Sequence, residues 1–315
     1  MDRIFVTRRI PPEHLEQLSG FDVKTWEGDG PVPRDILLEE VRSVRGLLCM
    51  LTDTIDIEVL DAAPDLEVIS QMAVGVDNID VAACHERGIA IGHTPDVLTE
   101  TVADSAFALL AAIVRRLPEG EREVRAGEWG PWDPFHLAGG DLHGTTLGIV
   151  GMGRIGRAVA RRARGFDMNV VYTSPRAADV DAERLELIDL LRNADHVVLC
   201  VRLDETTQRL ISVDELAAMK PTAYLVNVAR GPVVDTDALV EALTAGEIAG
   251  VALDVTDPEP LPGDHPLLDF DNCLVVPHIA SASVSTRMRM SQLAVENLWA
   301  GLRSEPMPAG YAEAG

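Results

Sequence analysis

Three polar residues with complementary chemistry each follow a short apolar run in the second half of the chain: Arg230, Glu259 and His278. An arginine offers a planar fork that binds a carboxylate, and a histidine gives or takes a proton near neutral pH. A carboxylate beside that histidine would orient and charge it. Together the three groups suit the reduction of a 2-oxo acid. Each alone also fits a structural role, as a strand-end arginine, a loop glutamate or a structural histidine.

A glycine-rich segment, Leu147–Gly156, is typical of a buried strand that runs into a turn and opens a helix. Gly151 would permit the tight turn, Gly153 would let the backbone approach a pyrophosphate, and Gly156 would let the helix pack against the strand. The free amides at the helix start would face the phosphates. Because helical spacing continues to Arg164 and a further strand follows, the context predicts a dinucleotide-binding βαβ unit.

The type of dinucleotide depends on the end of the next strand. An acidic residue that accepts a ribose 2′-hydroxyl is expected about 20 residues after the turn, but the sequence there runs Tyr172-Thr173-Ser174-Pro175-Arg176. A hydroxyl and a guanidinium without a carboxylate can bind a 2′-phosphate. We therefore predict that NADP(H) is preferred through Ser174 and Arg176, with NAD(H) as the alternative cofactor. Arg202 either adds charge near the adenine or faces solvent.

Four further apolar runs lack alternation, which predicts parallel strands buried on both faces: His196–Val201, Ala223–Val228, Ile248–Val255 and Cys273–Val276. Ligands of such sheets bind beyond the carboxyl ends of the strands. This rule selects Gly151–Gly156, Ser174–Arg176, Arg202, Ala229–Gly231, Thr256–Glu259 and His278 as a converging set. The full set of predicted cofactor contacts is Thr101, Gly151, Gly153, Arg154, Ile155, Gly156, Ser174, Arg176, Val201, Arg202, Thr207, Val228, Ala229, Asp254 and Ala280.

The part of the chain before Thr99 alternates apolar runs with helix-like segments and has no glycine fingerprint, which predicts another parallel sheet. The expected strands are Arg3–Thr7, Asp22–Trp26, Gly46–Leu51, Leu66–Ser70 and Ile89–Ile91, and the expected helices are Pro12–Leu18, Pro33–Val41 and Ile57–Ala62. A last helix, Ser281–Leu302, should return to this part. The predicted fold is α/β, with two Rossmann-like doubly wound parallel-sheet domains: a flavodoxin-like substrate-binding (catalytic) domain at 1–99 plus 283–315, and an NAD(P)-binding Rossmann domain at 100–282.

Between the two patterns lies Thr99–Leu117, which is apolar on more than one face and predicts a helix that Pro118 ends. Such a helix is buried between domains or in a subunit interface. The stretch Gly127–Leu142 carries Trp129, Trp132 and Phe135 among glycines and prolines. A loop of this length usually docks a partner or lines a site.

Composition narrows the class of protein. A length of 315 residues favours two domains, and a formal net charge of −24 disfavours nucleic acid and anionic membranes as partners. No apolar run suits a signal peptide or a membrane span. The scattered cysteines, Cys49, Cys84, Cys200 and Cys273, favour free thiols in a reducing cytoplasm over disulfides or a metal site.

With the glycine turn, the Arg230, Glu259 and His278 motifs resemble the D-isomer-specific 2-hydroxyacid dehydrogenase family, and within it the glyoxylate/hydroxypyruvate reductases. The resemblance covers nearly the whole chain. Further stretches that carry it are Gly46–Asp53, Gly75–Asn78, His93–Thr99, Arg115–Glu119 and Gly301–Pro308.

The resemblance implies a role for each motif. Arg230 would bind the substrate carboxylate and polarise the carbonyl, His278 would act as general acid, and Glu259 would keep His278 protonated and oriented. Hydride would pass from the nicotinamide to the carbonyl carbon and give a D-2-hydroxy acid. The protein would supply position and charge for chemistry that belongs to the cofactor.

The same resemblance extends to the substrate pocket and to a partner subunit. The backbone at Val74 and Gly75 would grip the carboxylate, with Leu51 near the small substrate group and Trp132 also against the substrate. Similar reductases carry a second tryptophan near the position of His136 that reaches into the neighbouring active site. The resemblance therefore implies a homodimer formed through the 100–142 region, with the pocket width left open.

Other activities share parts of this pattern. Formate dehydrogenases use a glutamine with the histidine, which Glu259 disfavours, and a phosphite dehydrogenase shares the fold. A D-3-phosphoglycerate dehydrogenase or another D-2-hydroxyacid dehydrogenase remains an alternative, as does a nucleotide-sensing, corepressor-like binding protein. The sequence does not rank glyoxylate against hydroxypyruvate.

Overall fold

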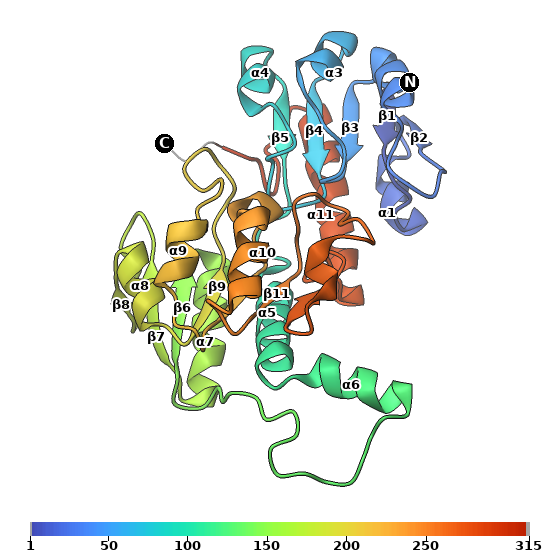
Figure 1. Ribbon diagram of the computed structural model, residues 1–315. Coiled ribbons are helices and arrows are strands. Elements are labelled where there is room, and N and C mark those ends of the chain that lie inside the picture. The colour runs from blue at the N-terminus through green and yellow to red at the C-terminus, as the bar shows by residue number, and fades with distance from the viewer. Residues whose placement is uncertain (1, 313–315) are drawn as a thin grey trace. The chain divides into compact units, whose positions relative to one another are not determined.

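The computed structural model describes residues 2–312, which divide into two compact units. The first unit holds the residues up to Leu98 together with those from Ser283 onward, and the second unit is Thr99–Ala282. Each unit is built on one parallel β-sheet with helices on both faces (Figure 1). The predicted α/β class with two doubly wound sheets is confirmed.

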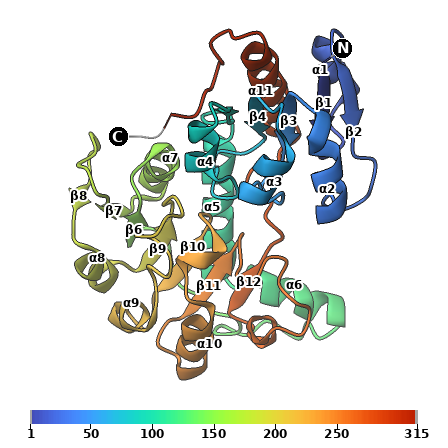
Figure 2. The same ribbon diagram turned by 90° about the horizontal axis from the view of Figure 1, so that it is seen from above.

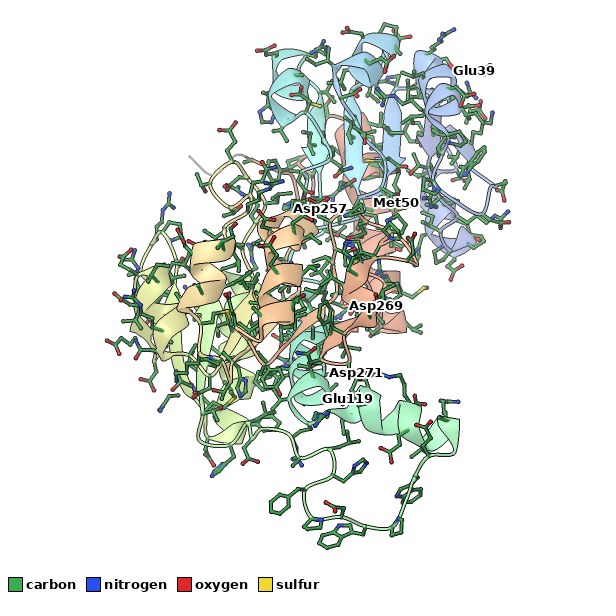
Figure 3. The ribbon with its side chains drawn as sticks, in the orientation of Figure 1. Glu39, Met50, Glu119, Asp257, Asp269 and Asp271 are labelled. Carbon is green, nitrogen blue, oxygen red and sulfur yellow. The ribbon has the colours of Figure 1, made fainter. Side chains whose placement is uncertain are left out.

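The sheet of the first unit has the strand order β2-β1-β3-β4-β5, and every pairing is parallel. This is the flavodoxin-like order, in which the chain changes direction across the sheet between β1 and β3. The strands are β1 (Arg3–Val6), β2 (Asp22–Thr25), β3 (Gly46–Cys49), β4 (Val68–Gln71) and β5 (Ala90–Gly92). Met50, labelled in Figure 3, directly follows β3 and marks the carboxyl edge of this sheet.

Successive residues of these strands point to opposite faces, so the sheet packs into a separate core on each side. On one face Ile4 and Val6 pack with Leu298 of α11, whereas Phe5 and Leu47 belong to the core on the other face. The helices of this unit are α1 (Pro12–Leu15), α2 (Arg34–Glu40), α3 (Ile57–Ala62), α4 (Val81–Glu86) and α11 (Val284–Leu302). The final helix thus belongs to the first unit.

The sheet of the second unit has seven parallel strands in the order β12-β11-β10-β9-β6-β7-β8 (Figure 2). The chain starts in β6, extends to β7 and β8 on one side, and then crosses to β9 on the other. The switch point between β6 and β9 is where doubly wound sheets bind ligands. The strands are β6 (Thr146–Val150), β7 (Asn169–Thr173), β8 (Glu183–Arg184), β9 (His196–Leu199), β10 (Tyr224–Asn227), β11 (Gly250–Leu253) and β12 (Cys273–Val275).

Helices cover both faces of this sheet. In Figure 2, α5 and α7 lie on one face, and α8, α9 and α10 lie on the other. The helices of this unit are α5 (Thr99–Val114), α6 (Leu117–Ala126), α7 (Arg154–Ala163), α8 (Leu187–Asn193), α9 (Val213–Ala218) and α10 (Thr236–Ala245). Short 3-10 helices occur in both units: η1 (Glu16–Leu18), η2 (Val41–Ser43), η3 (Arg164–Phe166), η4 (Gly231–Val233) and η5 (Pro266–Asp269).

The role predicted for Pro118 is wrong. The first long helix already ends at Val114, because Arg116 adopts a left-handed conformation with φ of 52°. Pro118 then lies in the first turn of α6, where a missing N–H costs nothing and the fixed φ suits a helix. Six further elements of the structure are not predicted from the sequence: α4, α6, α8, α9, α10 and β8.

Within residues 2–312, no helix has both the length and the apolar character that a membrane span requires.

Candidate active site

Three neighbouring strands of the second unit place the predicted catalytic residues at one edge of the sheet. β10, β11 and β12 run parallel and adjacent, and Arg230, Glu259 and His278 follow them in that order. Asp257, in the loop after β11, marks this edge in Figure 3. The strand order therefore gathers residues that are widely spaced in the sequence.

His278 and Glu259 form a direct pair. The Nδ1 atom of His278 lies 2.6 Å from Oε1 of Glu259, while Oε2 accepts a 3.4 Å hydrogen bond from the Thr256 amide. Burial raises the pKa of Glu259, but the hydrogen bond and charge of His278 outweigh it and leave that pKa lowered. Nε2 of His278 has no hydrogen-bond partner among residues 2–312 and is available to a ligand.

The backbone under His278 is strained and clamped. His278 has a φ of 53°, a left-handed conformation that costs a non-glycine residue about 1 kcal/mol or more. Its amide donates to the Asp254 carbonyl oxygen at 2.9 Å. Oδ1 of Asp254 accepts from the amides of Ile279 and Ala280 at 2.7 and 2.9 Å. Burial raises the pKa of the Asp254 carboxyl although these bonds oppose it. Sequence reasoning assigned Asp254 only to the cofactor and missed this clamp.

Arg230 sits in a tight turn stabilised by a buried asparagine. Nδ2 of Asn227 donates to the Arg230 carbonyl oxygen at 2.9 Å, and its Oδ1 accepts from the Ala229 amide at 3.0 Å. A Cβ on Gly231 would lie 1.9 Å from the Thr256 carbonyl oxygen, so only glycine fits where the two loops meet. Asn227 gave no signal in the sequence beyond its place at a strand end.

The glycine turn has the shape that a pyrophosphate requires. Gly151 has a φ of 100°, and a Cβ there would lie 2.8 Å from the Cys200 backbone. A Cβ on Gly156 would lie 2.1 Å from the Gly151 carbonyl oxygen, whereas one on Gly153 would meet nothing within 4 Å. Open space at Gly153 beside the amino end of α7 fits a phosphate group. These residues therefore fit a dinucleotide.

The loop after β7 holds the predicted 2′-phosphate residues and is closed by local bonds. Arg184 donates to the carbonyl oxygens of Ser174 and Pro175 at 3.0 and 3.2 Å. The Tyr172 hydroxyl accepts from the Ala178 amide at 2.9 Å. Arg176 is exposed in this loop. The loop shape is therefore defined without a carboxylate.

Comparison with known proteins agrees with this arrangement. Residues 107–280 match the family description "D-isomer specific 2-hydroxyacid dehydrogenase, NAD binding domain". The glyoxylate reductase of Thermofilum pendens is 48% identical over 98% of this chain and 93% of its own length. The human glyoxylate reductase/hydroxypyruvate reductase is 45% identical over 98% of this chain and 97% of its own length.

The chain belongs to the D-isomer-specific 2-hydroxyacid dehydrogenase family. It is an NAD(P)-dependent oxidoreductase. The structure of this dehydrogenase resembles that of a protein from Thermus thermophilus, with a TM-score of 0.94 and 47% identity over 98% of this chain and 100% of the other. It also resembles an NADPH-dependent glyoxylate/hydroxypyruvate reductase from Sinorhizobium meliloti in complex with NADP and malonate, with a TM-score of 0.87 and 36% identity over 99% and 97% of the two chains.

The other predicted cofactor residues of this dehydrogenase all lie in the second unit. Most stand at or just beyond the carboxyl ends of strands, whereas Thr101 lies in the first turn of α5. Arg202 is 62% exposed and pairs with Asp204 at 3.4 Å, so part of its charge is already neutralised. Thr207 closes the same loop, since its Oγ1 donates to the Arg202 carbonyl oxygen at 2.6 Å.

The predicted substrate residues of the dehydrogenase divide between the units. Leu51 follows β3, and Val74 and Gly75 follow β4, at the carboxyl edge of the first unit's sheet. Trp132 belongs to the second unit and lies in the irregular segment 127–145. Its side chain is 86% exposed.

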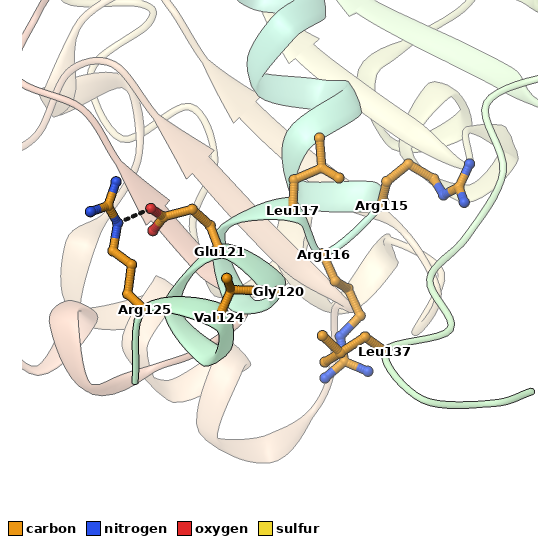
Figure 4. Close-up of a pocket in the computed structure, with 8 residues that line it drawn as sticks. All are labelled: Arg115, Arg116, Leu117, Gly120, Glu121, Val124, Arg125 and Leu137. Atoms are coloured by element: carbon orange, nitrogen blue, oxygen red, sulfur yellow. Dashed lines mark hydrogen bonds and ion pairs between the residues drawn. The ribbon is translucent and has the colours of Figure 1, made fainter. Parts of the chain in front are cut away.

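The segment that follows α6 carries three large, exposed aromatic side chains. Trp129, Trp132 and Phe135 are 75, 86 and 82% exposed. Nε2 of His136 lies 2.6 Å from Glu123 of α6, which ties the loop to the helix. Residues of α6, of the turn before it and of the segment that follows it line a hollow of about 570 Å³ (Figure 4). The lining residues are Arg115, Arg116, Leu117, Gly120, Glu121, Val124, Arg125 and Leu137.

Proposed function

We propose that this dehydrogenase reduces small 2-oxo acids, glyoxylate and hydroxypyruvate foremost, to D-2-hydroxy acids with NADPH as the preferred donor. The observation that carries the proposal is the 2.6 Å pair of His278 and Glu259, on the strand ends next to that of Arg230. The names of the 48% and 45% identical relatives support the substrate class.

The three residues divide the work by chemistry. The Arg230 guanidinium binds the substrate carboxylate and draws electron density from the neighbouring carbonyl. Nε2 of His278 donates its proton to the carbonyl oxygen as negative charge develops there. Glu259 holds the ring through Nδ1 and stabilises its protonated form. When bound in the second unit, the nicotinamide supplies hydride to the carbonyl carbon.

The first unit supplies the remaining substrate contacts in this proposal. The backbone at Val74 and Gly75 binds the carboxylate through its amides, and Leu51 lies against the small group on the carbonyl carbon. Among residues 2–312, neither the Val74 nor the Gly75 amide donates to any acceptor, which supports this role.

Preference for NADPH rests on the loop after β7. No carboxylate lies between Tyr172 and Ala178, so no negative charge opposes a 2′-phosphate there. The Ser174 hydroxyl and the Arg176 guanidinium are groups that bind a dianion. The relative from Sinorhizobium meliloti is named as NADPH-dependent, which supports the proposal.

We also propose that a second copy of the dehydrogenase covers the 100–142 region. Large exposed aromatic side chains mark interaction surfaces, and Trp132 and Phe135 are 86 and 82% exposed in the segment that follows α6. All four cysteines are free thiols, which fits the cytoplasmic location that we propose.

The direct test is oxidation of NADPH with glyoxylate, hydroxypyruvate, pyruvate and 3-phosphohydroxypyruvate. The proposal predicts turnover of the first two with the highest kcat/KM and a product of D configuration where the product is chiral. Highest kcat/KM with 3-phosphohydroxypyruvate would instead favour a D-3-phosphoglycerate dehydrogenase. Absence of turnover with all four would favour a nucleotide-sensing binding protein.

A further inference from the structure

The loop that follows β4 in the first unit has its carbonyl groups tied down one after another. The Ala73 carbonyl oxygen accepts from the Thr94 amide at 2.8 Å, and the Val74 oxygen accepts from Nδ1 of His93 at 2.9 Å. The Gly75 oxygen lies 3.4 Å from Nε2 of Gln71. The chain therefore fixes three consecutive peptide groups.

Fixing a carbonyl also fixes the amide on the other side of the same peptide bond. A trans peptide is planar, and its C=O and N–H point in opposite directions. Thr94 thus orients the Val74 amide, and His93 orients the Gly75 amide. Neither amide donates to an acceptor within the described chain. Two adjacent, oriented amides without acceptors suit a carboxylate.

His93 is itself held by the segment that follows α11. Its amide donates to the Ala309 carbonyl oxygen at 3.0 Å, and its own carbonyl oxygen accepts from Nδ2 of the fully buried Asn297 at 2.8 Å. Its ring lies edge-on to Tyr311 with centroids 5.2 Å apart and an interplanar angle of 89°. The backbone of His93 and one edge of its ring are therefore restrained.

The tautomer of His93 follows from its partner. A carbonyl oxygen only accepts, so Nδ1 must carry the hydrogen in the contact with Val74. His93 is half-buried, which limits competition from water for that bond. His93 thus holds the peptide between Val74 and Gly75 through a hydrogen bond that its side chain donates.

We propose that His93 is a positioning residue for substrate binding, which orients the Gly75 amide toward the carboxylate of the 2-oxo acid. The C-terminal segment around Ala309 and Tyr311 supports the ring and backbone of His93 in this role. The inference deepens the proposed function and rests on it. It assigns His93 no contact with the substrate or the cofactor.

The test compares His93→Ala with His93→Asn, whose side-chain amide places a donor near the position of Nδ1. We expect His93→Ala to raise the KM of the 2-oxo acid about 10-fold, the value of one hydrogen bond of about 1.4 kcal/mol. The kcat at saturating substrate and the Kd of NADPH should change less than about 2-fold. His93→Asn should recover most of the KM.

If His93→Ala does not fold, variants of Tyr311 and a binding measurement with oxamate test the same role. Tyr311→Ala should raise the KM in the same direction, and Tyr311→Phe, which keeps the ring, should not. Binding of oxamate, an unreactive 2-oxo acid isostere, to the complex with NADPH is measured by calorimetry and should weaken in parallel. This readout does not depend on turnover.

The outcomes separate this inference from the proposed function. An unchanged KM and oxamate affinity in both His93→Ala and Tyr311→Ala would overturn the role of His93 while leaving the reductase intact. Equal losses in His93→Ala and His93→Asn would also overturn it. Absence of turnover in the unmodified enzyme would instead refute the proposed function.

Discussion

Nδ1 of His278 lies 2.6 Å from Oε1 of Glu259, although the two residues are 19 positions apart in the sequence. Their loops leave adjacent parallel strands, β12 and β11, and Asp254 clamps the backbone that follows His278. The pair fixes one ring nitrogen and leaves Nε2 free to reach a ligand. This is the geometry that a general acid requires.

The charge on Glu259 should contribute to stability in a pH-dependent way. Its pKa is lowered in the folded protein below the ordinary value of 4.5. A lowered carboxyl pKa adds stability above pH 4.5, and this contribution disappears as the pH falls through the folded value. Glu259→Gln should therefore lower the free energy of unfolding at pH 7, by about 1 kcal/mol at most because solvent screens the pair.

Chemical denaturation at several pH values checks this prediction. The difference between the unmodified protein and Glu259→Gln should shrink as the pH falls below 4.5. Glu247→Gln is the matched control, because Glu247 is exposed on the same unit. A difference that stays constant over this range would contradict the prediction.

Two glycines of the same turn should respond in opposite ways to a single methyl group. Gly156→Ala places a Cβ 2.1 Å from the Gly151 carbonyl oxygen and should lower the melting temperature. Gly153→Ala meets no protein atom within 4 Å, so it should keep the melting temperature and lose NADPH affinity about 10-fold or more. Thermal unfolding and a fluorescence titration with NADPH measure both quantities. Normal NADPH affinity in Gly153→Ala would exclude a pyrophosphate at that turn.

Arg176 should decide between the two nicotinamide cofactors. A charge-assisted hydrogen bond contributes about 1.5–3 kcal/mol, so Arg176→Ala should lower kcat/KM for NADPH by about 10-fold to 100-fold. The value for NADH should not change. Arg192→Ala removes an exposed arginine from α8 of the same unit and serves as the control. An unchanged ratio of NADPH to NADH efficiency would refute the role of Arg176.

The exposed aromatic side chains of the segment 127–145 should hold two copies of the chain together. Replacing Trp132 and Phe135 by Ser removes two of the most exposed large apolar side chains without touching the core. We expect sedimentation velocity to shift from a dimer to a monomer, while the melting curve of the chain at low concentration is preserved. His143→Ser, at another exposed position of the same segment, is the control. A monomeric unmodified protein would rule out the proposed dimer.

Sequence reasoning reached the fold because its signals were local. The buried runs of the second unit appear as strands β9, β10, β11 and β12, trimmed by one to four residues. The prediction that Pro118 ends the long helix is wrong because proline fits the first turn of a helix as well as the position after its end. The short helices α8 and α9 bury Leu190, Leu191 and Leu216 in the core of the second unit, which composition does not reveal. The capping box of Ser212 and Glu215 at the start of α9 was a sequence signal that the prediction missed.

In the candidate site too, some residues were predictable from the sequence and others were not. Arg230, Glu259 and His278 were recognisable because each followed a strand and each had a chemically distinct side chain. The side chains that fix the backbone around these three residues had no comparable signal in the sequence. Asp254 acts by accepting two amides, and Asn227 by closing a turn, and both depend on loop conformations that only the structure provides.

Turnover and cofactor binding, measured together on His278→Ala, test most directly whether His278 is the general acid. A general acid contributes about 10²-fold to 10⁴-fold to the rate, and this role does not require His278 to hold the cofactor. We predict that kcat with glyoxylate falls by about that factor, while the Kd of NADPH from fluorescence titration changes less than about 2-fold. A variant that keeps a near-normal kcat, or that loses NADPH affinity as strongly as activity, would contradict the assignment.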